Sequence, residues 1–576
     1  MLRVLVLAVA MASLSVFAAE PALGHDLAPP GSFPGAAPGQ TLKAATRAEP
    51  ATTATPRADC GPGSRPEGAL QGRVPAGSDQ GFACNLVELG HEGRSGGFKV
   101  ERYVDPAGHE CAFYDTTLLF PTNALTLSTQ PTGVAVLDMS NPARPVRTAT
   151  LITPAMQSPH ESLVVNRKRG LLAAVMGTPA TAPGFVDLYD VRTDCRRPVL
   201  QSTSPVGILG HESGFAPDGK TLYATSIGTG QVTAVDVSNP KLPSTLGIYP
   251  YAVHGMNLSD DGNRAYMATI GEGLLIADTS QIQARKANPQ MPIVSRLKWD
   301  SLTIPQNAEP VTIGGKPFVV EVDEYSATEP GGGVASNGPV VGAARIIDIA
   351  DERNPKVVSN LRLAVHQPEN RAAIAGDPGA RLPVQGYAGH YCGVPQRSEP
   401  GIVACSFIAS GLRVFDIRDP YKPRELGYFV TPPANLGGSV VPAERSNYAM
   451  SRPSFAPARG EIWYSDGNSG FHALKATNGA WPFAAGNSGG GRAPAKARPC
   501  RSRRSFVIHL RRDLRSARVF VAGRRVKVRR GRRLTARVDL RGRRKGIVKV
   551  RIVGRTRSGR RVTETRRYRP CTRRRS

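Results

Sequence analysis

The chain has 576 residues, and its 74 lysines and arginines against 45 acids give a formal net charge of +29. Residues 501–576 hold 31 of these basic residues and three of the acids. The first 500 residues are therefore close to neutral, which excludes a protein that attracts polyanions over its whole surface. After the N-terminal apolar run, no segment approaches the ~20 apolar residues that a membrane-spanning helix needs.

The N-terminus has the pattern of an export signal. Residues 1–24 combine Arg3 with an apolar run over 4–18 and small residues at the end, which predicts a cleaved signal peptide. Eight cysteines without a close CxxC pair fit an oxidising compartment, so we expect a secreted or cell-surface protein. Residues 25–83 are rich in Pro, Ala, Thr and Gly and predict a flexible spacer.

One phrase recurs along the middle of the chain: an alternating apolar strand that ends in Asp, followed by a turn closed by Pro. Its period of two and its many Val, Ile, Leu and Phe residues predict strands. Six clear copies and a degraded seventh occupy residues 133–145, 185–198, 232–243, 274–292, 344–355, 412–423 and 471–479. Repeats at such spacing indicate units that bury their faces against their neighbours.

Further short strands separate the copies, over residues 160–175, 211–225 and 254–269, and two of these segments contain Asp-Gly turns. Several antiparallel strands per unit, repeated seven times, predict an all-β protein in which residues 84–482 form a seven-bladed β-propeller. A linker rich in Gly, Ala and Pro follows over 483–499.

The strand sequences GVAVLDMS, VTAVDVSN and LRVFDIRD are similar to the repeat that names the bacterial LVIVD-repeat proteins. The resemblance extends over residues 84–475. It implies an extracytoplasmic propeller. It brings no catalytic residue to this chain, because the family is defined by its repeat and not by a reaction.

Five of the ten histidines take corresponding places, at the start of the strand that opens a unit. They are His109, His160, His211, His254 and His390, and the fifth and seventh units have Asn307 and Ser451 there. Because the innermost strand of each blade lines the central channel, these residues would form a ring near one mouth. Several neutral imidazoles facing one axis are ligands for a transition metal such as copper or zinc.

A structural role is the interpretation that the sequence favours for these histidines. WD-repeat propellers carry a Gly-His pair at the blade entry that bonds to an Asp, and the repeat strands here offer Asp138, Asp236 and Asp416. We therefore expect each histidine to bond to the Asp of its own unit. The acids of FVVEVDEY, Glu321, Asp323 and Glu324, are expected to be solvated.

Four cysteines have a predicted partner. Cys392 and Cys405 flank a turn, and Cys500 and Cys571 bracket the C-terminal part, so each pair is a predicted disulfide. The other four, Cys60, Cys84, Cys111 and Cys195, allow three pairings, among which the sequence does not choose.

Residues 500–571 alternate apolar and basic side chains between Gly-containing turns, which predicts a small antiparallel β-sandwich, followed by a basic tail over 572–576. The candidate polyanion-binding residues are Arg524, Arg525, Arg529, Arg530, Arg532, Arg533, Arg543 and Arg544. Anionic cell-envelope polymers are the expected partners. The scarcity of aromatic residues argues against sequence-specific nucleic-acid recognition.

These patterns favour an exported, non-catalytic propeller that binds a protein or a small molecule on its face and contacts envelope polymers through its C-terminal part. The alternative is a copper- or zinc-dependent enzyme that acts on a small molecule at the histidine ring. Its histidine pattern is similar, at the level of the fold alone, to copper-dependent propeller oxidases of thiols. One observation separates the two: whether the histidines converge or turn to the Asp of their own unit.

Overall fold

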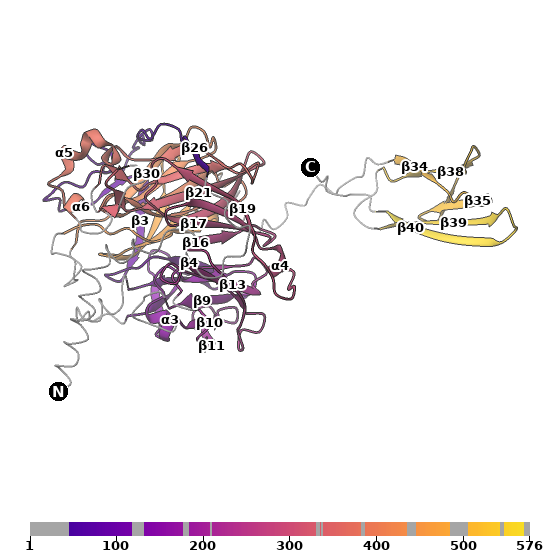
Figure 1. Cartoon of the computed structure of the whole chain (residues 1–576), viewed down its shortest axis with the longest axis horizontal. Coiled ribbons are helices and arrows are strands. Elements are labelled where there is room, and N and C mark those ends of the chain that lie inside the picture. Colours follow the sequence, from indigo (N-terminus) through magenta and orange to yellow (C-terminus); the bar gives the residue numbers. More distant parts are fainter. Residues whose placement is uncertain are drawn as a thin grey trace. The chain divides into compact units, whose positions relative to one another are not determined.

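The computed structural model describes residues 45–117, 132–176, 184–207, 210–329, 334–335, 338–381, 386–434, 445–483, 505–541 and 547–568 (Figure 1). The chain forms two compact units, Met1–Gly489 and Gly490–Ser576. Within the described ranges, no helix has the length and apolar character needed to cross a membrane.

The larger unit is built from sheets whose consecutive strands lie side by side and antiparallel, and three of these sheets gain an N-terminal strand, of which β1 is parallel to its neighbour. The sheets are numbered I to VII in chain order. Sheet I is β4 (Val100–Val104), β5 (Glu110–Asp115), β6 (Val134–Asp138) and β7 (Val146–Leu151). Sheet II is β8 (Val164–Asn166), β9 (Leu171–Val175), β10 (Val186–Asp190) and β11 (Val199–Ser204). Sheet III is β12 (Ser213–Phe215), β13 (Thr221–Ser226), β14 (Gln231–Asp236) and β15 (Ser244–Tyr249).

Sheet IV is β16 (Val253–Leu258), β17 (Arg264–Thr269), β18 (Gly273–Asp278), β19 (Ile293–Trp299) and the N-terminal β1 (Ala45–Arg47). Sheet V is β20 (Ile304–Ile313), β21 (Lys316–Glu324), β25 (Ala344–Asp348) and β26 (Lys356–Leu361). Sheet VI is β27 (Gly389–Gly393), β28 (Ile402–Phe407), β29 (Gly411–Asp416), β30 (Arg424–Val430) and the N-terminal β2 (Phe82–Cys84). Sheet VII is β31 (Ser454–Ala456), β32 (Glu461–Asp466), β33 (Gly470–Ala476) and β3 (Leu86–Glu92).

Short elements fill the connections between these strands. A small sheet joins β22 (Ser326–Ala327), β23 (Val334–Ala335) and β24 (Val340–Val341). The helices have one turn each: α3 (Pro154–Gln157), α4 (Ser280–Gln283), α5 (Arg371–Ile374) and α6 (Pro378–Arg381), with 3-10 turns η2 (Ala364–His366), η3 (Pro368–Asn370), η4 (Ile408–Ser410) and η5 (Pro457–Arg459).

The repeated phrase of the sequence supplies the third strand of every sheet, namely β6, β10, β14, β18, β25, β29 and β33. Each of these strands is hydrogen-bonded on both sides, so its apolar residues are covered by neighbours, and this accounts for the strength of the pattern. The all-β class is thereby confirmed.

The Asp that ends each clear copy caps the following turn. Asp236 Oδ1 accepts a hydrogen bond from the backbone N–H of Ser238 at 2.8 Å, and Asp138 and Asp416 bond to the residue two positions ahead in the same way. The expected bond between histidine and Asp is therefore wrong. First and third strands run parallel, so a histidine at the start of the first strand and an Asp at the end of the third lie at opposite ends of the sheet.

Buried apolar clusters fill the space between successive sheets. Leu171 of sheet II shares such a cluster with Leu222 of sheet III. Trp463 of sheet VII shares another with Tyr114 of sheet I, so the last sheet packs against the first. Four-stranded antiparallel sheets that pack in chain order around a ring are the architecture of a β-propeller.

The N-terminal segment is packed against the propeller over the described residues 45–83, and there the predicted spacer over 25–83 is wrong. β1 pairs with β19 and β2 pairs with β30. The carboxylate of Glu67 is buried 2.7 Å from the guanidinium of Arg413, and a disulfide joins Cys60 to Cys84. Strand pairing, an ion pair and a disulfide hold this segment, together with a small apolar cluster in which Ala58 and Val74 pack against Tyr428 and Val430 of β30.

Two further disulfides join Cys111 to Cys195 and Cys392 to Cys405. The first links sheets I and II, and the second links neighbouring strands of sheet VI. Several predictions fall outside the described residues: the signal peptide over 1–24, the pair Cys500 and Cys571, the tail over 572–576 and nearly all of the linker over 483–499.

The smaller unit has two antiparallel sheets. One contains β34 (Ser505–His509), β38 (Thr535–Asp539) and β37 (Val528–Arg529), and the other contains β36 (Arg524–Val526), β35 (Leu514–Val521), β39 (Val548–Thr556) and β40 (Arg561–Tyr568). Both contribute to one buried cluster, which includes Ile508 and Val538 from the first sheet and Val519 and Val550 from the second. The alternation of the sequence therefore separates an apolar interior from a basic surface.

Candidate metal centre

Four of the five aligned histidines come together in the larger unit. His254 and His390 lie on the first strands of sheets IV and VI, and His160 and His211 precede the first strands of sheets II and III. The ring centroids of His160 and His211 are 4.5 Å apart, and those of His211 and His254 are 4.6 Å apart. The propeller brings these strand starts together because every first strand lies on the inner side of its sheet.

The carboxylate of Glu161 lies among the four imidazoles. Its oxygens are 3.1 Å from Nε2 of His211, 3.2 Å from Nε2 of His390, 3.5 Å from Nε2 of His254 and 3.8 Å from Nε2 of His160. A second carboxylate, of Glu324 at the end of β21, lies 3.4 Å from Nε2 of His390 and 3.6 Å from Nε2 of His254. All four rings thus present the same nitrogen to one anionic centre.

Backbone carbonyls fix the orientation of two of these rings. Nδ1 of His254 donates to the carbonyl of Pro305 at 3.0 Å, and Nδ1 of His390 donates to that of Met450 at 2.7 Å. Because a carbonyl oxygen only accepts, Nδ1 carries the proton and a neutral ring has its lone pair on Nε2. A carbonyl behind a histidine is the usual second partner of a metal-bound imidazole.

Burial controls the protonation of the site. It lowers the pKa of His160 and of His254 to about 3, helped by the neighbouring imidazoles, so both rings are neutral at pH 7. For His390, the carboxylates of Glu161 and Glu324 outweigh burial and raise the pKa to about 9. The imidazoles in turn overcome burial at Glu161 and hold its pKa well below the ordinary value.

Two buried polar atoms at this centre, Nδ1 of His160 and Oε2 of Glu212, have no hydrogen-bond partner among the described residues. Nε2 of His211 and of His390 instead face the oxygens of Glu161 and Glu324. An unpaired buried polar atom costs about 1–3 kcal/mol. The two unpaired atoms would be satisfied by a polar or ionic occupant of the centre.

An ion pair lies next to the histidines. Nζ of Lys99 contacts the carboxylate of Glu212, which also accepts from Nδ2 of Asn307 at 2.9 Å. The Lys99 ammonium stands 4.3 Å from the centre of the Tyr391 ring. Lys99 therefore supplies the countercharge of Glu212 and leaves Glu161 and Glu324 to the histidines.

A second ionic cluster involves the first strands of sheets V and I. Glu309 of β20 lies 2.8 Å from Arg452 and 2.9 Å from Arg397, and Arg452 also approaches Glu101 of β4 at 3.6 Å. Burial opposes ionisation of Glu309, but the two arginines lower its pKa to about 2. These charged side chains fill the space between first strands beyond the histidines.

The histidines differ in their access to solvent. The side chains of His160 and His211 are each 13% exposed, whereas those of His254 and His390 are almost fully buried. The ring of Phe98 packs 4.5 Å from that of His160 and 5.3 Å from that of His390. A small molecule would therefore approach from the side of His160 and His211, beside an aromatic wall.

His109 does not belong to this group. It follows the hairpin after β4 and opens the second strand of sheet I, so it lies at the other end of the sheet from the first-strand start. Its Nδ1 is 2.8 Å from Asp105 and 3.7 Å from Asp194, beside the disulfide of Cys195. The predicted alignment failed here because it shifted His109 by one strand.

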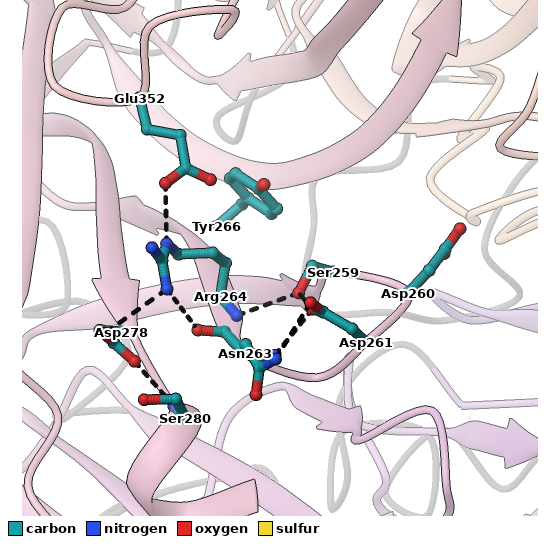
Figure 2. A pocket seen from close by; sticks show the side chains of 9 residues that line it. All are labelled: Ser259, Asp260, Asp261, Asn263, Arg264, Tyr266, Asp278, Ser280 and Glu352. Atoms are coloured by element: carbon teal, nitrogen blue, oxygen red, sulfur yellow. Dashed lines mark hydrogen bonds and ion pairs between the residues drawn. The ribbon is translucent and has the colours of Figure 1, made fainter. Parts of the chain in front are cut away.

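A hollow lies along the hairpin between β16 and β17, and Figure 2 shows the side chains that line it, among them Ser259, Arg264 and Glu352. Arg264 crosses it and bonds to Glu352 at 2.8 Å and Asp278 at 3.5 Å. Its polar side chains satisfy one another, so we assign no chemistry to it.

The sequence interpretation missed part of the site. Glu321, Asp323 and Glu324 are buried and not solvated: the first two pair with Arg345, and Glu324 reaches the histidines. Lys99 and Tyr391 gave no signal in the sequence, because their roles depend on neighbours from other sheets. Asn307 was found by its repeat position.

In the smaller unit the predicted basic residues that are described, other than the half-buried Arg533, are exposed. They are Arg524, Arg525, Arg529, Arg530 and Arg532, while Arg543 and Arg544 lie outside the described residues.

Comparisons with known proteins add little. No family model matches the chain, and no curated protein matches it. Among solved structures, a functionally unknown protein from Desulfotomaculum acetoxidans is similar with a TM-score of 0.38 and 11% identity, over 57% of this chain and 84% of that one. The Cps50 (Swd1) β-propeller domain of Myceliophteria thermophila gives a TM-score of 0.39 and 13% identity, over 68% of this chain and 99% of that one.

Proposed function

We propose that the larger unit is a closed seven-bladed propeller that binds one divalent transition-metal ion, copper or zinc, on His160, His211, His254 and His390. The observation that carries this proposal is the convergence of four Nε2 atoms on the carboxylate of Glu161.

The distances between the candidate ligand atoms are compatible with one bound ion. Ligands bound at 2.0–2.1 Å in tetrahedral geometry stand about 3.3 Å from one another. The Nε2 atoms of His211, His254 and His390 lie 3.1, 3.5 and 3.2 Å from oxygens of Glu161. The ligand atoms of His160, Glu161 and His211 all lie within 4.8 Å of one another, which is close enough to share one ion. His254 and His390 approach the same carboxylate.

The charge of the site and the type of its ligand atoms also suit a divalent copper or zinc ion. Imidazole nitrogens suit copper and zinc, and a divalent ion would balance the two carboxylates of Glu161 and Glu324. Without it, the Nε2 lone pair of neutral His254 faces the carboxylates of Glu161 and Glu324, which is unfavourable in a buried site.

The function that this centre supports is that of an exported metal-dependent enzyme for a small molecule. A bound ion would supply Lewis-acid chemistry or redox chemistry. The chain itself would contribute the approach past His160 and His211 and the Phe98 wall.

The test is elemental analysis of the purified, exported full chain. We expect about one copper or zinc per chain in the wild type, and its loss in His254→Gln and in His390→Gln. His109→Gln is the matched control and should keep the metal. After the metal is removed with a chelator, added metal at a hundred times its Kd should raise the free energy of unfolding of the wild type by about 2.7 kcal/mol, and that of H254Q by much less.

The proposal would be contradicted by a wild-type protein that contains no metal on elemental analysis and is not stabilised against unfolding by added metal. The protein would then be the non-catalytic binding protein that the sequence favours, with a histidine cluster that only stabilises the fold. Full metal content in both histidine variants would place the ion elsewhere.

We also propose that the protein is extracytoplasmic and contacts the cell envelope. The N-terminal pattern and the three disulfides support an extracytoplasmic protein, and the repeat strands support membership of the LVIVD-repeat proteins. The excess of 31 basic over three acidic residues after residue 500 supports contact of the smaller unit with anionic envelope polymers.

A further inference from the structure

The sheet β36-β35-β39-β40 of the smaller unit has one apolar side and one basic side. Along β39, Val550 and Ile552 are buried, whereas Lys549, Arg551 and Arg555 are exposed. Successive side chains of a strand point to opposite sides of the sheet, so the exposed bases share one side.

Strand register adds bases from the neighbouring strands to that side. Arg555 is paired with Arg561 and Lys549 with Arg567 of β40, while Arg518 of β35 is paired with Val553. The cationic face is defined as Arg518, Lys549, Arg551, Arg555, Arg561 and Arg567, all of them exposed. Most of the residues predicted from the sequence to bind polyanions lie outside this face.

No described carboxylate pairs with a base of the cationic face. The three acids of the unit are engaged with neighbours in the sequence: Asp513 with Arg511, Asp539 with Arg541 and Glu564 with Arg566. Asp539 belongs to the other sheet, and Glu564 occupies an alternate position on β40, away from the cationic face. The six charges are therefore available to an external anion.

The spacing of these charges suits an extended chain of phosphates. Bases two residues apart on β39 are about 6.6–6.8 Å apart along the strand, and paired bases on β39 and β40 are about 4.8 Å apart across it. Five of the six are arginines, whose planar guanidinium binds a phosphate through two parallel hydrogen bonds. A linear polymer lying along β39 would meet a base at nearly every alternate residue.

The aromatic content of the face argues against bases in that polymer. Phe520, paired with Arg551, is the sole aromatic residue on this side among the described residues, and the Arg551 guanidinium covers its ring at 5.1 Å. Proteins that bind single-stranded nucleic acid stack successive bases on several aromatic rings. One covered ring does not provide this.

We infer that the cationic face binds an extended phosphodiester polymer without bases, of the poly(glycerol phosphate) type. This inference rests on the proposed contact of the smaller unit with anionic envelope polymers and names the surface and the ligand chemistry.

The test compares two triple variants of the full chain that remove the same charge. The face variant carries Arg551→Gln, Arg555→Gln and Arg561→Gln, and the control carries Arg529→Gln, Arg530→Gln and Arg532→Gln. Binding of poly(glycerol phosphate) of defined length is measured as a function of salt concentration. The face variant should bind at least about tenfold more weakly, with a slope of log K against log salt that is smaller by about 2, whereas the control should change by less than about threefold.

Each outcome decides a separate point. No binding of the polymer by the wild type at physiological salt would overturn the proposed contact itself. Equal losses in both variants would overturn the face and leave only diffuse attraction. Tighter binding of oligothymidylate, heparin or polyglutamate than of the phosphate polymer at matched charge would overturn the ligand chemistry. Melting of both variants at the wild-type temperature excludes unfolding as the cause of a loss.

Discussion

The two units of this protein differ in where their charged side chains lie. The larger unit is nearly neutral yet buries ionised side chains in its interior, whereas the smaller unit has an apolar interior and carries its charge on the surface. The net charge of +29 therefore reports the basic surface of the smaller unit. It does not report the charged side chains buried in the larger unit, because their positive and negative charges cancel.

Two arginines illustrate the buried arrangement. Arg345 and Arg413 occupy the same place in their repeats, three residues before the terminal Asp, and neither side chain is exposed. Arg413 lies between Glu67 and Glu425, at 2.7 Å and 3.1 Å, and stacks 4.4 Å from the ring of Tyr428. Such groups are costly to bury and remain only because partners compensate them.

The largest expected effect comes from breaking this triad. Arg413→Met leaves Glu425 buried without a countercharge and leaves Glu67 only the half-exposed Arg57, 3.8 Å away. We expect a loss of about 3–5 kcal/mol in the free energy of unfolding by urea. The triple variant Arg413→Met, Glu67→Gln, Glu425→Gln removes the charges together and should recover much of that loss. An Arg413→Met protein as stable as the wild type would show that buried charge is unimportant to the larger unit.

A smaller effect is expected from Glu309, and only in acid. Its pKa is lowered from 4.5 to about 2, so its ionised form stabilises the fold above pH 4.5, and this contribution is lost as the pH falls through 2. In Glu309→Gln, the deficit in unfolding free energy should be constant above pH 5 and should shrink between pH 4.5 and 2. A deficit that does not change with pH would contradict ionisation of this carboxyl group in the fold.

The smallest effect is expected in the smaller unit. Asp539 pairs with Arg541 on the surface at 2.7 Å, where solvent screens the interaction. Asp539→Asn should leave the melting temperature of the protein unchanged at physiological salt. A measurable drop would mean that surface ion pairs stabilise this unit and would weaken the contrast between the two units.

Much of the fold follows from patterns within a few residues. The seven repeat strands, the capped turn after Asp138 and its equivalents, and the alternation of β39 all depend on local periodicity and turn chemistry. The same patterns identified His160, His211, His254 and His390 as strand starts. They did not locate His109 correctly, because a sequence alignment does not show which strand of a sheet a histidine opens.

The sequence by itself determined that this is a repeat protein made of strands, with a neutral body and a basic end, because periodicity and composition are properties of the chain alone. Only the tertiary structure decided which side chains meet. The packing of the sheets brings His160 and His390 onto one carboxylate, and Glu67 reaches Arg413 across 346 residues. Contacts of this kind depend on how whole sheets pack, and that packing sets the burial, the pKa values and the candidate metal centre.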